Sequence, residues 1–207
     1  MVYQIGMGPF GSNIKVSTFV DEGVPIISGQ HLKAPLLKDG DNDFVTFEHA
    51  DKLKNSNVFR EDIIFTHAGN IGQVSIIPEL SCYDRYVISQ RQFFLRANNK
   101  ITSPYFLLYF FRSSLGQHLL LSNASQVGVP SIARPSSHLK SIELVAPEFK
   151  LIKIFEKYCK TLINGVVQRK KQTTLLKNLR DTLLPKLLSG EITLLEAEQT
   201  VSEAENV

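Results

Sequence analysis

Residues 148–190 read EFKLIKIFEKYCKTLINGVVQRKKQTTLLKNLRDTLLPKLLSG, and this stretch decides the predicted fold. Before Gly190 it contains one glycine, Gly165, and one proline, Pro185, so little in it opposes a continuous helix. Its apolar residues recur in alternating steps of three and four, which is typical of one helix face. A helix of about 40 residues is about 60 Å long, longer than the domain that precedes it. We predict a long helix over residues 147–190, with Gly190 as its stop.

The apolar face of this helix predicts a protein partner. A polar run, residues 168–174, interrupts the face, and leucines resume after it. An isolated helix has nothing against which to bury such a face, so we expect a second helix to pair with it. The alternative is that the helix folds back on its own domain and ends at residues 185–190. The predicted pairing residues are Ile152, Phe155, Cys159, Leu162, Val166, Leu176, Leu179 and Leu183.

Residues 1–146 predict a separate α+β domain. Short β-rich runs alternate with turn residues, and strands and helices do not follow a regular β-α-β order. We therefore expect a mixed or antiparallel twisted sheet. Its predicted strands are residues 24–28, 62–66, 74–77, 85–95 and 142–145.

Two local signals place turns and a helix in this domain. Gly69 and Gly72, between residues 62–66 and 74–77, allow the positive φ angles that a long hairpin loop needs. Ser103 and Pro104 predict a helix start, with serine as the N-cap and proline at the first position. The apolar face expected of that helix comprises Phe106, Leu107, Phe110, Phe111 and Leu115.

The charges are unevenly distributed along the chain. The formal net charge is only +3. Residues 150–190 nevertheless carry ten basic residues against two acidic ones, whereas residues 191–207 carry five glutamates and no base. Residues 85–140 contain seven Lys or Arg and no acid. A basic half in a nearly neutral protein suits a polyanionic partner, although ordinary solvated charges give the same pattern. We expect the acidic tail, residues 191–207, to be flexible.

Several functional classes lack support in the sequence. No apolar run reaches the roughly 20 residues of a membrane span, and the N-terminus lacks the pattern of a secretory signal. Cys82 and Cys159 are far apart, so we expect no disulfide or metal site, and a cytoplasmic location. No nucleotide-binding, zinc-protease or serine-hydrolase motif occurs. The one enzyme-like pattern is Glu148-Phe-Lys150, an E-x-K of the kind that helps some nucleases bind Mg²⁺.

Five segments, in order, resemble the specificity subunits of Type I restriction–modification systems. They are residues 8–15 (GPFGSNIK), 23–32 (GVPIISGQHL), 62–73 (DIIFTHAGNIGQ), 129–142 (VPSIA…LKSI) and 179–192 (LRDTLLPKLLSGEI). The last is the most distinctive, because it is similar to the end of the family's second conserved helix. Each segment alone is weak, but together they cover about residues 6–192.

The resemblance implies a half-length subunit. Family members carry two target-recognition domains, each of which reads half of a split DNA site, and helices that form a coiled coil and bind methyltransferase subunits. This chain has one such domain and one helix. The strand that usually precedes the GPFGS segment, with its L-G-D/E-I/V motif, is missing. This departure suggests either a fragment or a second polypeptide that supplies the piece.

DNA reading requires phosphate contacts and base contacts, and we expect both in the loops and the acid-free stretch. Phosphate contacts are expected from Lys15, Arg85, Arg91, Arg96, Lys100, Arg112, Arg134 and Lys140. Base contacts are expected from Gln30, His31, Lys33, His67, Asn70, Ser125, Gln126, Ser131 and Arg134. Each of these polar residues could instead only stabilise its own turn.

The prediction is thus a non-catalytic DNA-recognition subunit without a cofactor or metal. Its expected partners are double-stranded DNA, the methyltransferase and restriction subunits, and a second copy or another specificity chain. Two alternatives remain open from the sequence: an Mg²⁺-dependent nuclease built on Glu148 and Lys150, and a coiled-coil regulator that pairs with another specificity subunit without binding DNA.

Overall fold

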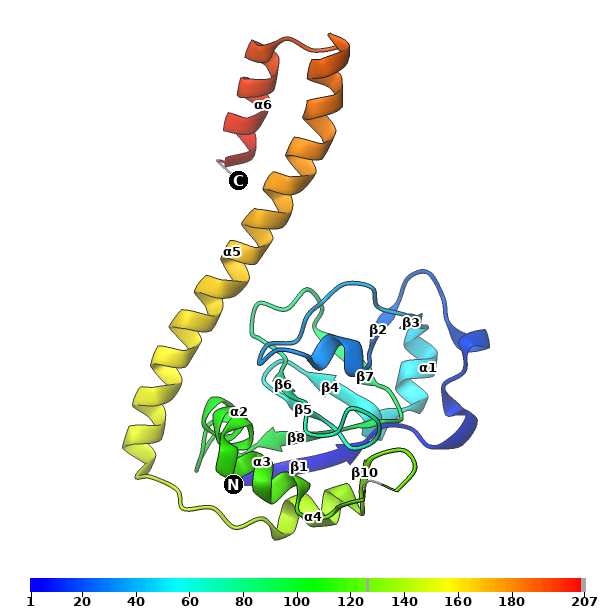
Figure 1. Cartoon of the computed structure of the whole chain (residues 1–207), viewed down its shortest axis with the longest axis vertical. Coiled ribbons are helices and arrows are strands. Elements are labelled where there is room, and N and C mark those ends of the chain that lie inside the picture. The colour runs from blue at the N-terminus through cyan, green and yellow to red at the C-terminus, as the bar shows by residue number, and fades with distance from the viewer. Residues whose placement is uncertain (126, 206–207) are drawn as a thin grey trace. The chain divides into compact units, whose positions relative to one another are not determined.

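Two four-stranded sheets lie in the first of the chain's two units, Met1–Thr161, which we call the head (Figure 1). The computed structural model describes residues 1–125 and 127–205. One sheet is antiparallel in the order β1-β8-β5-β6, and the other is mixed in the order β3-β2-β7-β4, because β2 and β7 run parallel. The strands are β1 Val2–Met7, β2 Val24–Ile27, β3 Phe44–Val45, β4 Asn57–Phe59, β5 Ile63–Thr66, β6 Val74–Ile76, β7 Arg85–Ile88, β8 Gln92–Ala97, β9 Ala124–Ser125 and β10 Ser131–Ile132.

Helices and short 3₁₀ turns lie between these strands and after the last of them, so the predicted α+β class is confirmed. The helices are α1 Phe47–Lys52, α2 Pro104–Arg112, α3 Ser114–Leu121, α4 Pro135–Ser141, α5 Phe149–Ser189 and α6 Leu194–Glu205. The 3₁₀ turns are η1 Gly11–Asn13, η2 Val16–Thr18, η3 Gly29–Leu32 and η4 Lys54–Ser56. No helix in the described part of the chain is both long enough and apolar enough to span a membrane.

The core has two apolar layers around the antiparallel sheet. Ile64 of β5 belongs to a buried cluster with Ile27 and Ile88 of the mixed sheet. The next residue, Phe65, points to the opposite side, where its ring meets that of Phe111 in α2 edge-on at 5.2 Å between centroids. Because both sides of β5 are covered, all four of its residues are buried and the strand shows no alternation of apolar and polar residues.

The predicted start of α2 is confirmed, but the helix is shorter than expected. The Ser103 hydroxyl accepts a hydrogen bond from the Tyr105 N–H, and Pro104 is the first helical residue. At Ser113 the chain leaves helical geometry, and its hydroxyl caps α3 by accepting from the Gly116 N–H. Leu115 therefore lies in α3 and is 61% exposed, so its assignment to the buried face was wrong.

Two predicted strands were also wrong. Residues 85–95 form two strands, because the Gln92 N–H bonds back to the Ser89 carbonyl at 3.1 Å and turns the chain between β7 and β8. Residues 142–145 form no strand; they follow α4 as irregular chain, and Val145 is 96% exposed. A β-branched composition does not make a strand where no neighbouring strand offers hydrogen bonds.

A strand does precede the Gly8-Pro-Phe-Gly-Ser12 segment, contrary to the expectation that this piece is missing. It is β1, which pairs antiparallel with β8 in a register that places Ile5 opposite Leu95. The run VYQIGM lacks the family's expected motif, so the resemblance did not predict this strand.

The first turns of α5 belong to the head, which extends beyond the predicted boundary at residue 146 as far as Thr161. Ile152 and Cys159 are 2% and 7% exposed. The Phe155 ring meets Tyr109 edge-on at 5.8 Å. The Lys160 Nζ lies 2.7 Å from a Glu61 carboxylate oxygen. These contacts fix the start of α5 on the head's own surface.

The second unit begins at Leu162 and contains the rest of α5 and α6. The helix continues through Pro185 and ends at Gly190, whose φ of +74° confirms the predicted stop. The acidic tail was expected to be flexible, but Leu194–Glu205 form α6, which runs back beside the last turns of α5 (Figure 1). Thr193 and Glu196 explain this, because each side chain accepts a hydrogen bond from the other residue's backbone N–H, as in a capping box.

Candidate nucleic-acid interface

Three loops of the head meet side by side. The His67 N–H, in the β5–β6 loop, donates to the Arg91 carbonyl in the β7–β8 turn at 2.9 Å. The Gly69 N–H donates to the Pro130 carbonyl at 2.8 Å, and the Ile132 N–H donates to the His67 carbonyl at 2.8 Å. We call residues 67–73, 89–91, 124–125 and 127–134 the three-loop surface. Gln126, a predicted base contact, lies outside the described residues.

Glycines shape this surface as predicted. Gly69 and Gly72 have φ angles of +83° and +84°, which L side chains rarely adopt. A Cβ on Gly72 would lie 2.8 Å from the Gln117 side-chain oxygen, so this part of the loop packs closely against α3. Gln117 holds the loop there, donating to the Gly72 carbonyl at 3.0 Å.

Polar side chains on the three-loop surface are available to a ligand. Asn70, Arg91 and Arg134 are exposed, and none makes a side-chain hydrogen bond or ion pair within the described residues. The Arg91 guanidinium lies close to Gly69, because a Cβ built on this glycine would be 3.5 Å from the Arg91 Nη1. Ser125 is also exposed, and Ser131 is half-buried in the β9–β10 pair. Two cations and several hydrogen-bonding groups thus gather from three loops far apart in sequence.

His67 holds two of the loops together. Its Nε2 lies 3.1 Å from the Gln90 carbonyl oxygen, so the ring nitrogen must donate and the neutral ring carries its proton there. Burial lowers the pKa of His67, which keeps the ring neutral near pH 7. The predicted base contact is thus a half-buried side chain whose Nε2 is already used.

The turn η3 borders the three-loop surface, because a Cβ on Gly29 would lie 3.2 Å from the Gln73 side-chain oxygen. Gln30 and Lys33 are exposed on this turn. His31, predicted as a base contact, is only 3% exposed, and its Nδ1 accepts the Ser28 N–H at 2.9 Å. His31 therefore stabilises its own turn.

Arg96 was predicted to hold phosphate, but the fold uses it internally. Its guanidinium forms two hydrogen bonds to Asp62, of 2.8 and 2.6 Å, and a third to Gln4 of 2.8 Å. It also lies over the rings of Phe59 and Phe94, at 5.2 and 5.4 Å from their centroids. Three of its five N–H groups are thus bonded within the head, so the structure gives Arg96 an internal role, and its phosphate contact stays a prediction.

Asp62 explains why Arg96 is needed there. The carboxylate is 1% exposed, and burial raises its pKa, while the hydrogen bond from Arg96 and one from the Phe59 N–H oppose the rise. A buried carboxylate without a cation would be strongly destabilising. This ion pair could not be predicted from the sequence, because its two members are far apart along the chain.

Two further arginines of the acid-free stretch have internal partners. The Arg85 Nε donates to the Asn57 side-chain oxygen at 2.7 Å, and its Nη2 lies 2.8 Å from an Asp51 oxygen. The Arg112 Nη1 donates to the Val74 carbonyl at 2.7 Å. The predicted phosphate contacts at Arg85 and Arg112 are therefore side chains that hold loops and strands of the head.

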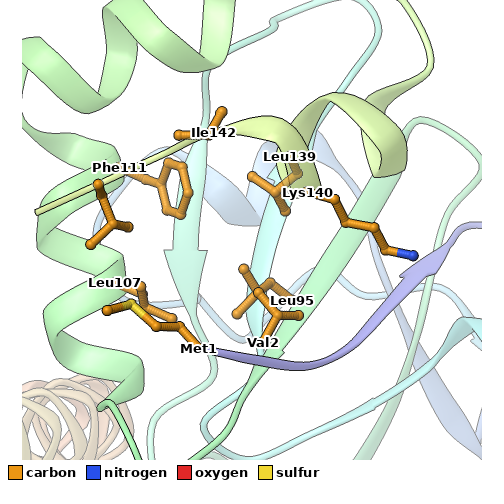
Figure 2. A pocket seen from close by; sticks show the side chains of 9 residues that line it. Met1, Val2, Leu95, Leu107, Phe111, Leu139, Lys140 and Ile142 are labelled. Carbon is orange, nitrogen blue, oxygen red and sulfur yellow. The ribbon is translucent and has the colours of Figure 1, made fainter. Parts of the chain in front are cut away.

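Other predicted cations lie apart from the three-loop surface. Lys140 lines an apolar pocket of about 430 Å³ among Met1, Leu107 and Phe111, and Figure 2 shows its amine pointing away from these side chains. The other lining residues are Val2, Leu95, Leu139, Ile142 and Leu144.

Lys100 lines a polar hollow of about 330 Å³ that also includes Arg60 and Asn98. Lys15 is exposed, and its backbone N–H donates to the Thr18 hydroxyl at 3.3 Å. No contact links Lys15 or Lys100 to the three loops within the described residues. The predicted phosphate contacts therefore lie in separate places and do not form a single basic surface.

The predicted pairing residues of α5 form two groups. Ile152, Phe155 and Cys159 lie in the head and contact it, so for these three the predicted role in a free seam was wrong. The remaining five lie in the second unit. Leu162 is 70% exposed, Val166 41% and Leu176 50%, whereas Leu179 and Leu183 are half-buried.

The E-x-K residues of the nuclease alternative, Glu148 and Lys150, are both exposed at the start of α5. Within the described residues, no group of three or more His, Cys, Asp or Glu is placed to hold a metal ion.

The comparisons with known proteins give a likeness in structure only. No protein-family model matches the chain. No curated protein matches its sequence. The crystal structure of a Type I restriction–modification system S subunit from M. genitalium is similar over 91% of this chain and 44% of that one, with a TM-score of 0.64 and 15% identity.

A structure from a study of the assembly and conformational transition of the type I R-M system is similar over 88% of this chain and 42% of that one, with a TM-score of 0.55 and 17% identity. The chain thus spans less than half the length of the solved chains it matches. The likeness shows that it has the fold expected from the resemblance: an α+β head followed by a long helix.

Proposed function

We propose that this chain is a cytoplasmic, non-catalytic DNA-specificity subunit of a Type I restriction–modification system, in a half-length form. The observation that carries the proposal is the structural likeness to S subunits over about nine-tenths of this chain and under half of theirs. One head and one helix correspond to one target-recognition domain with one spacer helix.

The head would read one half of a split DNA site through the three-loop surface. Arg91 and Arg134 supply cations for phosphates or guanine, and Asn70 supplies an amide that can pair with adenine. Gln30 and Lys33 border the same surface. The loops are bonded to one another through backbone groups, so these side chains have fixed starting points for groove contacts.

The part of α5 that begins at Leu162 would bind a partner protein. Leu162, Val166 and Leu176 are exposed apolar residues on a helix, and they favour a second helix as the partner, from another copy or another specificity chain. Methyltransferase subunits would dock on the resulting pair and, with restriction subunits, be directed to the DNA. A symmetric pair of identical heads requires a symmetric DNA site.

The test is selection of bound sequences from a randomised duplex library by the purified chain. The proposal expects an interrupted palindrome at one preferred spacing, with affinity that falls steeply as salt rises from 50 to 200 mM. Enrichment of no sequence, or binding that is insensitive to salt, would contradict it. Cleavage of the library in Mg²⁺, lost in Lys150→Ala, would instead support the nuclease alternative.

A further inference from the structure

Arg134 has an unusual backbone for its residue type. Its φ and ψ of +46° and +56° lie in the left-handed region, which glycine and asparagine adopt far more readily than arginine. Pro135 follows it, and a residue before proline is normally extended. Among the described non-glycine residues, only Asp41 and Glu61 share a positive φ.

Hydrogen bonds on both sides hold this conformation. The Ala133 N–H donates to the Asn123 carbonyl at 3.1 Å, and the Asn123 side chain returns a bond to the Ala133 carbonyl at 2.8 Å. The Arg134 carbonyl accepts the His138 N–H at 2.9 Å. His138 is itself fixed, with Nε2 at 3.0 Å from the carbonyl of Leu119 at the end of α3. The Cα of Arg134 therefore has a defined position.

Local structure gives no reason for an arginine at this position. Arg134 is the N-cap of α4 and makes no side-chain capping bond, whereas asparagine, serine or glycine would suit a cap better. Its side chain is exposed and has no hydrogen-bond or ion-pair partner within the described residues. Arg134 thus has an unfavourable backbone conformation and is a poor N-cap, and no side-chain hydrogen bond or ion pair within the described residues compensates. Such a residue is expected at a functional site.

The surroundings of Arg134 indicate what its side chain meets. It comes two residues after Ile132, whose N–H is bonded to the His67 carbonyl, so it belongs to the three-loop surface with Arg91 and Asn70. Val127 and Val129 precede it in the same loop and are 90% and 61% exposed, so this part of the surface is open to a ligand. A planar guanidinium offers two parallel N–H groups, which match guanine O6 and N7 or a pair of phosphate oxygens.

We propose that Arg134 is a specificity-determining residue that reads a guanine in the DNA half-site by two hydrogen bonds. The inference rests on the proposed function. Guanine is favoured over phosphate because Arg134 lies on the same loops as the hydrogen-bonding side chains Asn70 and Ser131, and bidentate contact with a guanine edge is the commonest specific role of an arginine at such a surface. Loss of Arg134 removes preference at one G·C pair, while the rest of the site is still read.

The experiment compares wild type with Arg134→Gly and Arg134→Lys on the selected duplex and on a set with each base pair changed singly. Arg134→Gly is expected to raise or preserve the melting temperature, because glycine suits the left-handed backbone. It is expected to weaken binding about 10- to 100-fold and to abolish discrimination at one G·C pair. Arg134→Lys keeps the positive charge but lacks the two parallel N–H groups of the guanidinium. It is therefore expected to lose discrimination at the same G·C pair.

Asp41→Gly is the matched control. Asp41 is also exposed, with φ of +53°, so this change relieves a similar backbone conformation without removing Arg134. It is expected to stabilise the protein and leave base preference intact.

Three outcomes would overturn the inference while the proposed function stands: unchanged base preference in Arg134→Gly, uniform weakening on all duplexes as for a phosphate contact, or a fall in melting temperature that assigns Arg134 to the fold. If the wild type binds no duplex at all, the proposed function fails with it.

Discussion

Arg96 and Arg134 belong to the same acid-free stretch of sequence, yet their surroundings are opposite. Arg96 is bound by Asp62 and Gln4 and lies over two aromatic rings, whereas Arg134 is exposed and has no hydrogen-bond or ion-pair partner within the described residues. One helix shows the same contrast, because Ile152 of α5 is buried in the head and Leu176 is half exposed. A basic or apolar residue therefore indicates an external partner only where the fold itself does not already bind that side chain.

Removal of the Asp62 carboxylate tests the internal role of Arg96, and it has the largest expected effect on the free energy of unfolding. Asp62→Ala leaves Arg96 without its carboxylate in a half-buried setting, which is expected to lower the free energy of unfolding by about 3–5 kcal/mol. Urea unfolding followed by tyrosine fluorescence measures it. The double variant Asp62→Leu with Arg96→Met should recover much of the loss; a small effect of the single change would show that Arg96 is free to act elsewhere.

The two parts of α5 are expected to respond differently to the same kind of truncation. Ile152→Ala creates a cavity in the head and should lower the free energy of unfolding by about 2–5 kcal/mol. Leu176→Ala is expected to change it by no more than about 0.5 kcal/mol in the monomer, because half of this side chain is already in water.

Sedimentation at several protein concentrations completes that comparison. Leu176→Ala should weaken self-association, whereas Ile152→Ala should alter it only through stability. Equal self-association of wild type and Leu176→Ala would show that this leucine takes no part in helix pairing.

Arg91 is expected to matter for DNA and not for folding. Arg91→Ala should weaken binding to the selected duplex about tenfold, the effect of roughly one charged hydrogen bond, and should shift the melting temperature little. Fluorescence anisotropy at fixed salt measures the affinity. Lys140→Ala is the charge-matched control, since this lysine lines the apolar pocket and not the three-loop surface; an equal loss in both variants would mean that only net charge counts.

His67 should give the smallest effect, a pH dependence of stability. Burial lowers its folded pKa below 6.5, so on acidification the unfolded chain takes up a proton first. The stability associated with the neutral ring is present above about pH 6.5 and is lost as the pH falls through the lower folded value. The free energy of unfolding from pH 7.5 to 5.5 should fall less in His67→Gln than in wild type. Parallel pH profiles would contradict the role of the neutral ring.

The parts of the fold that depend on local chemistry could be predicted from the sequence. The glycine loop between β5 and β6, the serine–proline start of α2 and the glycine end of α5 were predicted, because each depends on residues close together in the chain. The class α+β followed from the same signals, and the resemblance suggested the head-and-helix fold.

Long-range partners could not be predicted. Asp62 and Arg96 meet only because β5 and β8 are neighbours, and residues 142–145 are not a strand because no strand lies beside them. The helix in the acidic tail depends on a capping box, Thr193 with Glu196, that could have been found in the sequence. Only the structure shows that the three loops meet. It also shows that the side chains of Arg91 and Arg134 have no hydrogen-bond or ion-pair partner within the described residues.

Hydrogen exchange of the full chain, with and without its selected duplex, can show which surface of the head contacts DNA. We expect slower exchange on DNA binding in the three-loop surface, residues 67–73, 89–91, 124–125 and 127–134, and no change around the polar hollow at Arg60 and Lys100. Protection at that hollow, with the three loops unaffected, would contradict it.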